Sequence, residues 1–288
     1  MIRCVSRVTG VLFPLTLCAV PGFAENSNCN SLPGYTALKA QLTAAVSAES
    51  SGLDLNMWGT IVDRDGIVCA VAFTGTNRGA QWPGSRVISA QKANTANSFS
   101  LDASAKSGSN LGGALALSTA NLFAAVQPGG SLFGLQESNP VDTSVAYKGP
   151  SSNYGTANDP MTGEKIGGVN VFGGGLALYN ANHQIVGAIG VSGDTSCADH
   201  DIAWRTRHNL DLDHLGTVIP GPAGIFNGDT TRPDNIIYDI AATPGGSGSI
   251  QGNVGVSRSG FGHPTCLNTL NDFTGTSGGA PNLPAVRP

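Results

Sequence analysis

Three residues with metal-ligating or aromatic side chains recur at a spacing of four near residue 200. His200, Trp204 and His208 share one face of a helix predicted over residues 198–208, because positions i, i+4 and i+8 lie on one helix face. Such a stripe can present an imidazole and a flat aromatic surface to a planar ligand. The alternative is structural, with His200 as a polar residue at the helix start and Trp204 in the core.

Ser192 and Gly193 end an apolar strand just before this helix. The first N–H groups of a helix lack partners within the helix and lie at its positive dipole end, so this junction can hold an anion such as a carboxylate. Helix capping is the commoner reason for a serine or threonine at such a position. The residues alone leave both interpretations open.

Two predicted hairpins and three predicted helices must position these residues. Alternating apolar residues predict paired strands at 58–62 with 67–73, and at 176–179 with 185–191. Apolar residues on one face predict a helix over 36–48. Further helices are predicted over 87–99 and over 198–208, where Asp199 and Asp201 suit the first turn. Ser85 is the expected N-cap of the second helix. Further strand candidates lie at 169–172 and 236–240.

Four motifs follow one another in the order in which one protein family has them. The segment from Val186 to Gly193 (VGAIGVSG) closely resembles the signature of the GlcG/HbpS-like haem-binding family. The segments IVDRDGIV from Ile61, QKANTA from Gln91 and GGLALY from Gly174 are similar to further motifs of that family. Alanine stands in the last motif where the family has proline. The resemblance covers residues 35–100 and 166–210.

The resemblance implies a fold and a set of site residues. The implied fold is α+β and profilin-like, with an antiparallel sheet of about five strands, packed helices and a tendency to form homo-oligomers. Lys92 matches the family's lysine and Asp199 its aspartate, whereas His200 stands where the family usually has glutamate. The expected ligand-binding set is Lys92, Ser192, Gly193, Asp199, His200, Trp204 and His208. Haem is the expected cofactor, and the resemblance identifies no single axial histidine.

The first 24 residues have the pattern of a secretory signal peptide. Arg3 and Arg7 precede an apolar run, and Gly22-Phe23-Ala24 gives a small-x-small cleavage site. Cleavage removes these two of the 15 basic residues and none of the 19 acidic ones, so the mature net charge is −6. This charge argues against nucleic acid as a partner. No later segment is apolar for long enough to span a membrane, so we expect a periplasmic or secreted protein.

Four cysteines remain after cleavage, namely Cys29, Cys69, Cys197 and Cys266. Export and an even number of cysteines indicate two disulfides, for which three connectivities are possible. We favour Cys29–Cys69, which ties the N-terminal arm to the first hairpin, and Cys197–Cys266, which pins the C-terminal part to the predicted helix. A four-cysteine metal site lacks the usual C-x₂-C spacing, and the identity of any other metal site is unknown. His263 is close to Cys266 and is expected to be structural.

Composition divides the mature chain into a domain and an extension. Residues 25–215 form the GlcG/HbpS-like domain, with a Gly/Ser-rich insertion at about 101–165. Residues 216–288 are a Pro/Gly-rich extension, and we expect its last dozen residues to be disordered and to make no core contacts.

Three function classes fit these features. The leading hypothesis is an exported binding protein for haem or a related small ligand, without catalysis. An enzyme is the second, acting on a small organic acid with the Ser192-Gly193 junction as anion site and Asp199 or His200 as general base. The third is a structural oligomer that binds no ligand.

Overall fold

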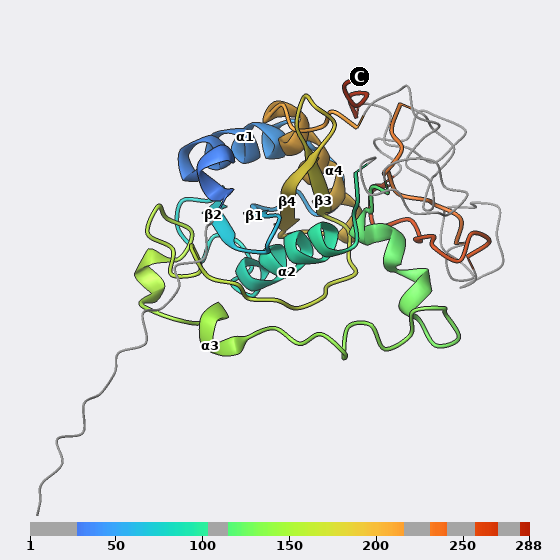
Figure 1. Ribbon diagram of the computed structural model, residues 1–288, viewed down its shortest axis with the longest axis horizontal. Helices are drawn as coiled ribbons and strands as arrows, with labels where there is room; N and C mark the ends of the chain where they lie inside the picture. Colours follow the sequence, from blue (N-terminus) through green and yellow to red (C-terminus); the bar gives the residue numbers. More distant parts are fainter. Residues whose placement is uncertain (1–27, 103–114, 216–230, 241–256, 270–282) are drawn as a thin grey trace, which may run out of the picture.

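The computed structural model describes residues 28–102, 115–215, 231–240, 257–269 and 283–288. The expected signal peptide lies outside these residues. Within them, two antiparallel hairpins make one sheet (Figure 1). The first pairs β1 (Trp58–Asp63) with β2 (Val68–Phe73), and the second pairs β3 (Gly175–Tyr179) with β4 (Ile185–Ser192).

The strand order β2-β1-β4-β3 places the two hairpins side by side through antiparallel pairing of β1 with β4. The α+β architecture is confirmed, with four strands rather than about five in the described part of the chain. Segments 169–172 and 236–240 are not strands. The backbone of the second is bonded to a side chain instead, because the Ile237 N–H donates to Asn121 Oδ1 at 2.9 Å.

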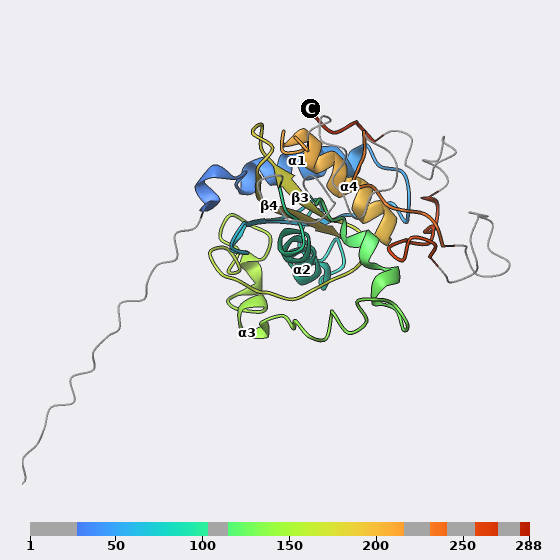
Figure 2. The same ribbon diagram turned by 45° about the vertical axis from the view of Figure 1, so that its right-hand side comes forward.

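Helices cover both faces of the sheet (Figures 1 and 2). α2 (Ser85–Ser98) packs on one face, and α1 (Tyr35–Ser47) and α4 (Ser196–Asn209) pack together on the other. All three predicted helices are therefore confirmed. The N-cap prediction is wrong by one residue, since Gly84 caps α2 and Ser85 begins it. None of the described helices is long and apolar enough to cross a bilayer.

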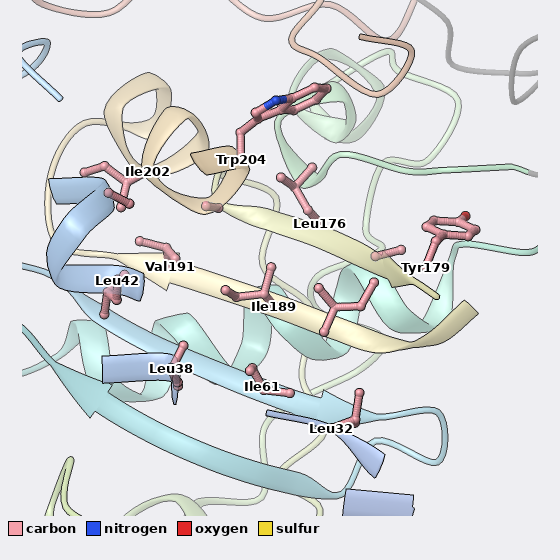
Figure 3. Close-up of a cluster of buried hydrophobic side chains, with 14 of the residues drawn as sticks. Leu32, Leu38, Leu42, Ile61, Leu176, Tyr179, Ile189, Val191, Ile202 and Trp204 are labelled. Carbon is pink, nitrogen blue, oxygen red and sulfur yellow. The ribbon is translucent and has the colours of Figure 1, made fainter. Parts of the chain in front are cut away.

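The main core lies between the sheet and the α1–α4 pair (Figure 3). Its buried side chains come from the sheet and from both helices of the pair, namely Leu38, Leu42, Ile61, Leu176, Ile189, Val191, Ile202 and Trp204. Each such aliphatic side chain contributes about 1.5–3 kcal/mol by leaving water.

α2 lies directly on β4 at the opposite face. A Cβ on Gly190 would come within 1.9 Å of the Ser89 carbonyl oxygen, so only glycine allows this approach. The glycine at this position therefore sets the distance between the helix that carries Lys92 and the strand that ends in Ser192.

The insertion is irregular but packed. Between residues 115 and 165 it forms only short helical turns, namely η2 (Thr119–Leu122), η3 (Ala124–Val126), α3 (Thr143–Ala146) and η4 (Ser151–Asn153). It runs along the outer side of α2 in both views (Figures 1 and 2). Ala146 and Met161 are fully buried there with residues of α2 and the sheet. The insertion therefore forms a further layer outside α2.

Both predicted disulfides are present. Cys29, in the turn η1 (Asn28–Ser31), bonds to Cys69 with the Cα atoms 5.1 Å apart, and Cys197 bonds to Cys266 with the Cα atoms 5.9 Å apart. In the described residues, both groups of clustered metal-ligating side chains contain one of these cysteine pairs. Their sulfur atoms are thus committed to disulfides rather than to a metal.

The expectation of a disordered tail is wrong for residues 283–288. Leu283 and Val286 are buried in the α1–α4 core, and the Trp204 indole N–H donates to the Pro284 carbonyl at 2.9 Å. Two apolar side chains three residues apart were enough to anchor a segment whose composition is rich in proline. Residues 270–282 lie outside the described part of the chain.

Candidate functional site

The predicted stripe on α4 does not face a cleft. His200 is fully buried, its Nδ1 lies 3.1 Å from the Ser118 hydroxyl, and its Nε2 lies 3.0 Å from Asn235 Oδ1. Trp204 is in the core, and His208 Nδ1 pairs with Asp213 at 2.7 Å. Burial lowers the pKa of His200 to about 4, so its ring is neutral at pH 7. The structural interpretation of His200 and Trp204 therefore fits this geometry, because residues of the insertion and the extension cover that face of α4.

The predicted anion site at the end of β4 already holds a carboxylate. The N–H groups of Gly193 and Asp194 donate to Asp199 Oδ1 at 3.0 and 2.8 Å. Lys92 Nζ donates to Asp199 Oδ2 at 2.6 Å and to the Val191 carbonyl at 3.0 Å. The Gly193 N–H at the expected anion site thus binds the chain's own Asp199, so the expected organic-acid mechanism lacks this donor for an external anion.

Burial sets the electrostatics of this lysine–aspartate pair. Desolvation raises the pKa of Asp199 to about 6, although the nearby Lys92 opposes the shift. Desolvation also lowers the pKa of Lys92, again opposed by its partner. The pair connects two helices on opposite faces of the sheet, because Lys92 comes from α2 and Asp199 from the first turn of α4.

A cleft of about 330 Å³ opens beside this pair, between α2 and the start of α4. We call it the Lys92 cleft; it is lined by Trp82, Ser85, Ile88, Lys92, Phe172, Ser192, Asp194, Ser196 and Asp199. It brings together three predicted site residues, Lys92, Ser192 and Asp199. Gly193, His200, Trp204 and His208 are not among its lining residues.

A larger cleft of about 590 Å³ lies on the other side of the segment that leads into α2. We call it the aromatic cleft; it is lined by Trp58, Asn77, Arg78, Gly79, Pro83, Gly84, Tyr147, Ser151 and Tyr154. Three of these residues have aromatic rings, and Arg78 is the one residue among the nine with a charged side chain.

Arg86, at the start of α2, fixes the tyrosine wall of this cleft. Its guanidinium is buried and forms a two-pronged ion pair with Asp159, in which Nε donates to Oδ2 at 2.9 Å. It also donates to the Ala146 carbonyl at 2.7 Å and lies 3.6 Å from the centre of the Tyr154 ring. One side chain of α2 therefore holds both insertion segments that carry the tyrosines.

Sequence reasoning missed the aromatic cleft because its wall lies in the Gly/Ser-rich insertion. One local signal was available there. Asp142 precedes Thr143-Ser144 and caps α3, since its carboxylate accepts from the N–H groups of Ser144 and Val145. This N-cap pattern would have predicted the short helix that ends beside Tyr147.

Comparison of the sequence with models of known protein families gives one match. The model of the HbpS-like family, described as "Haem degrading protein HbpS-like", matches residues 36–207, which is more than half of the chain. The chain belongs to this HbpS-like family. No curated protein matches it. The family match ends within α4, so the segments 257–269 and 283–288 of this HbpS-like protein lie beyond it.

Three of the solved structures that match this chain are compared with it by identity, coverage and TM-score. Klebsiella pneumoniae ORFY shares 25% identity over 62% of this chain and 90% of its own, with a TM-score of 0.39. A structure titled as a PduOC:heme complex shares 22% over 63% of this chain and 96% of its own, also with a TM-score of 0.39. HbpS shares 15% over 61% and 86%, with a TM-score of 0.32.

Proposed function

We propose that this HbpS-like protein is exported and binds haem in the aromatic cleft. Membership of a haem-related family is the observation that carries the proposal. The position of the site rests on the chemistry of the two clefts, because a haem site needs apolar surface for the porphyrin and cationic groups for its propionates.

The residues of the aromatic cleft fit haem. Its volume of about 590 Å³ lies within the usual range for small-molecule sites, which is about 300–1,000 Å³. Trp58, Tyr147 and Tyr154 supply flat apolar surface, and Arg78 supplies a cation for a propionate. The Lys92 cleft is smaller, and its two carboxylates outnumber its one ammonium, so it repels the propionates of haem.

Each residue of the aromatic cleft has a separate task in this proposal. Tyr147 or Tyr154 would hold the haem iron through its phenol, as tyrosine does in other haem proteins. Arg86 keeps the Tyr154 ring in place from beneath. When bound, haem supplies a redox-active iron, and the protein supplies its ligand, its orientation and its electrostatic surroundings.

A hemin titration of the mature protein, followed by the Soret band, tests the site. The variant carrying Tyr147→Ala and Tyr154→Phe loses both phenols, and we expect its affinity for hemin to fall at least about tenfold. Tyr154→Phe keeps a ring on Arg86. Tyr35→Phe, a tyrosine of α1 on the other face of the sheet, is the matched control and should bind as the wild type does.

A different result would move the site. If the double variant binds hemin unchanged while His208→Ala abolishes the Soret band, the stripe on α4 holds the haem and the aromatic cleft does not. Failure of the wild type to bind hemin would overturn the proposal as a whole.

Export is supported by the signal-peptide pattern and by two disulfides that join four mature cysteines. N-terminal sequencing of protein recovered from the periplasm or the medium should give a chain that begins at Glu25. Full-length protein in the cytosol would contradict this. The homo-oligomer implied by the family stays a prediction, which light scattering of the mature protein tests.

A further inference from the structure

A serine in the wall of the Lys92 cleft is hydrogen-bonded to a buried histidine. Ser196, the first residue of α4, lines that cleft, and its Oγ lies 2.8 Å from His263 Nε2. The Gly173 N–H donates to the same Oγ at 2.7 Å, which leaves the hydroxyl proton for the histidine. The nucleophile–base distance lies within the range seen in serine hydrolases.

His263 is held in the orientation and tautomer of a general base. Its Nδ1 lies 2.5 Å from the Pro264 carbonyl, which only accepts, so Nδ1 carries the proton and Nε2 is free to accept one. Its ring contacts Phe123 at a centroid distance of 4.9 Å. Burial lowers its pKa to about 4, so the ring is neutral at pH 7.

A disulfide fixes the base against the nucleophile. Cys197 follows Ser196 directly and bonds to Cys266, three residues beyond His263. The Cys197 N–H also donates to Cys266 Sγ at 3.2 Å. The extension, which lies outside the family match, is thus clamped so that its histidine stands beside the first residue of α4.

The chain contains a second serine–histidine pair that shows what a structural pair looks like. Ser118 and His200 are both fully buried, and the second ring nitrogen of His200 is bonded to Asn235. Neither residue lines a cleft described above. Ser196 differs because it is partly exposed and borders a cleft.

One donor for a developing oxyanion is the backbone N–H of Ser196 itself. Among the described residues, Cys266 and Thr195 accept from the N–H groups of Cys197 and Ala198, whereas the Ser196 N–H has no acceptor. That N–H lies at the positive end of the 14-residue helix α4. In serine proteases the N–H of the nucleophile itself is one of the oxyanion donors.

We propose that Ser196 and His263 form a catalytic dyad that hydrolyses small neutral esters in the Lys92 cleft. Ser196 Oγ attacks the ester carbonyl carbon, and its proton passes to His263 Nε2. The bond to the alcohol breaks, the leaving oxygen takes that proton, and an acyl-Ser196 remains. Water then attacks the acyl carbon, gives its proton to His263 and releases the acid, and Ser196 Oγ recovers the proton.

The cleft selects the substrate class. Its volume of about 330 Å³ suits a short ester, and Trp82, Ile88 and Phe172 offer apolar surface for the acyl or alcohol part. Asp194 and Asp199 against the single Lys92 disfavour an anionic substrate and favour departure of the acid product.

The test uses the mature protein with both disulfides formed, a fluorophosphonate probe and p-nitrophenyl acetate. We expect one phosphonyl group per chain, mapped to Ser196, and release of p-nitrophenol that falls at least about 100-fold in Ser196→Ala and in His263→Gln. Ser118→Ala removes the other serine–histidine bond and is the matched control, with labelling and rate as in the wild type.

Labelling of another residue, absence of labelling in the folded wild type, or an unchanged rate in Ser196→Ala would each overturn the dyad. Circular dichroism of every variant shows that it is folded. If His263→Gln does not fold, Ser196→Ala still decides the matter, because it replaces a small, partly exposed side chain. Hemin binding is measured at the aromatic cleft and does not enter this test.

Discussion

The two clefts lie on opposite sides of residues 82–85, where the chain enters α2, and yet their chemistry differs. The aromatic cleft has three aromatic rings and one guanidinium. The Lys92 cleft has two carboxylates, one ammonium and a serine bonded to a histidine. The segment 82–85 therefore borders both the proposed haem site and the proposed ester site.

The difference comes from the segments that this chain adds to the sheet and its helices. Tyr147 and Tyr154 reach the aromatic cleft from the insertion, and His263 of the extension is hydrogen-bonded to Ser196 in the wall of the Lys92 cleft. The hairpins and α2 give the two clefts their position. The added segments supply the tyrosines of one cleft and the histidine that bonds Ser196 in the other. A substitution in one added segment should therefore disrupt one cleft and leave the other intact.

The largest expected effect is a loss of stability when Arg86, which supports only the aromatic cleft, is replaced. Arg86→Leu leaves Asp159 buried without its partner and removes the support of Tyr154, so we expect a loss of about 3–5 kcal/mol in the free energy of unfolding. Urea unfolding measures it. Lys148→Met removes an exposed ion pair with Glu164 and should cost about 0–1 kcal/mol. Equal losses in the two variants would contradict the role given to Arg86.

Removing one disulfide at a time sharpens the comparison. Replacing Cys197 and Cys266 by alanine should lower the free energy of unfolding by about 2–4 kcal/mol and abolish fluorophosphonate labelling, while hemin binding persists. The matched control replaces Cys29 and Cys69. It should lose similar stability and keep the labelling. If the variant without Cys197 and Cys266 is still labelled, the position of His263 beside Ser196 does not depend on this disulfide.

Acid should destabilise the side of the molecule that carries His263. Burial lowers its pKa from 6.5 in the unfolded chain to about 4, so its contribution is complete above pH 6.5 and is lost as the pH falls towards 4. The loss is about 3 kcal/mol. His200 acts in the same direction, whereas Asp199, with its pKa raised to about 6, acts in the opposite one. Urea unfolding of His263→Gln at pH 7 and pH 4 should show a smaller difference than the wild type.

The smallest expected effect concerns one exposed cation. Arg78→Gln should weaken hemin binding about tenfold, equivalent to about 1.4 kcal/mol, because the aromatic cleft loses its charge for a propionate. Ser196 labelling should not change. Arg258→Gln, at an exposed arginine of the extension, controls for net charge. Equal weakening by both substitutions would indicate a general electrostatic effect rather than a contact.

The elements of the fold were predictable where a local pattern carried them. The alternation around the two turns predicted both hairpins, apolar periodicity predicted α1, and the polar residues near the helix starts supported α2 and α4. The disulfide pairing followed from placing each cysteine relative to those elements. These features depend on neighbours along the chain, which a single sequence displays.

The candidate site was predictable only in part. The family resemblance placed Lys92 and Asp199 in one expected ligand-binding set, and the structure shows that these two residues form an ion pair with each other. The i, i+4, i+8 spacing left two interpretations of His200 open, because helix periodicity tells which residues share a face but not whether a distant segment covers that face. Asn235 of the extension and Ser118 of the insertion cover it. The contact between Ser196 and His263 spans 67 residues and left no local signal.

The burial of Leu283 and Val286 bears on the order of events during synthesis. Both side chains complete the core between α1 and α4, which begins with residues near position 38. The ribosome releases the chain from its N-terminus, so the core stays incomplete until the last of these residues has emerged. We therefore expect this core to reach its full stability only after Val286 has left the ribosome.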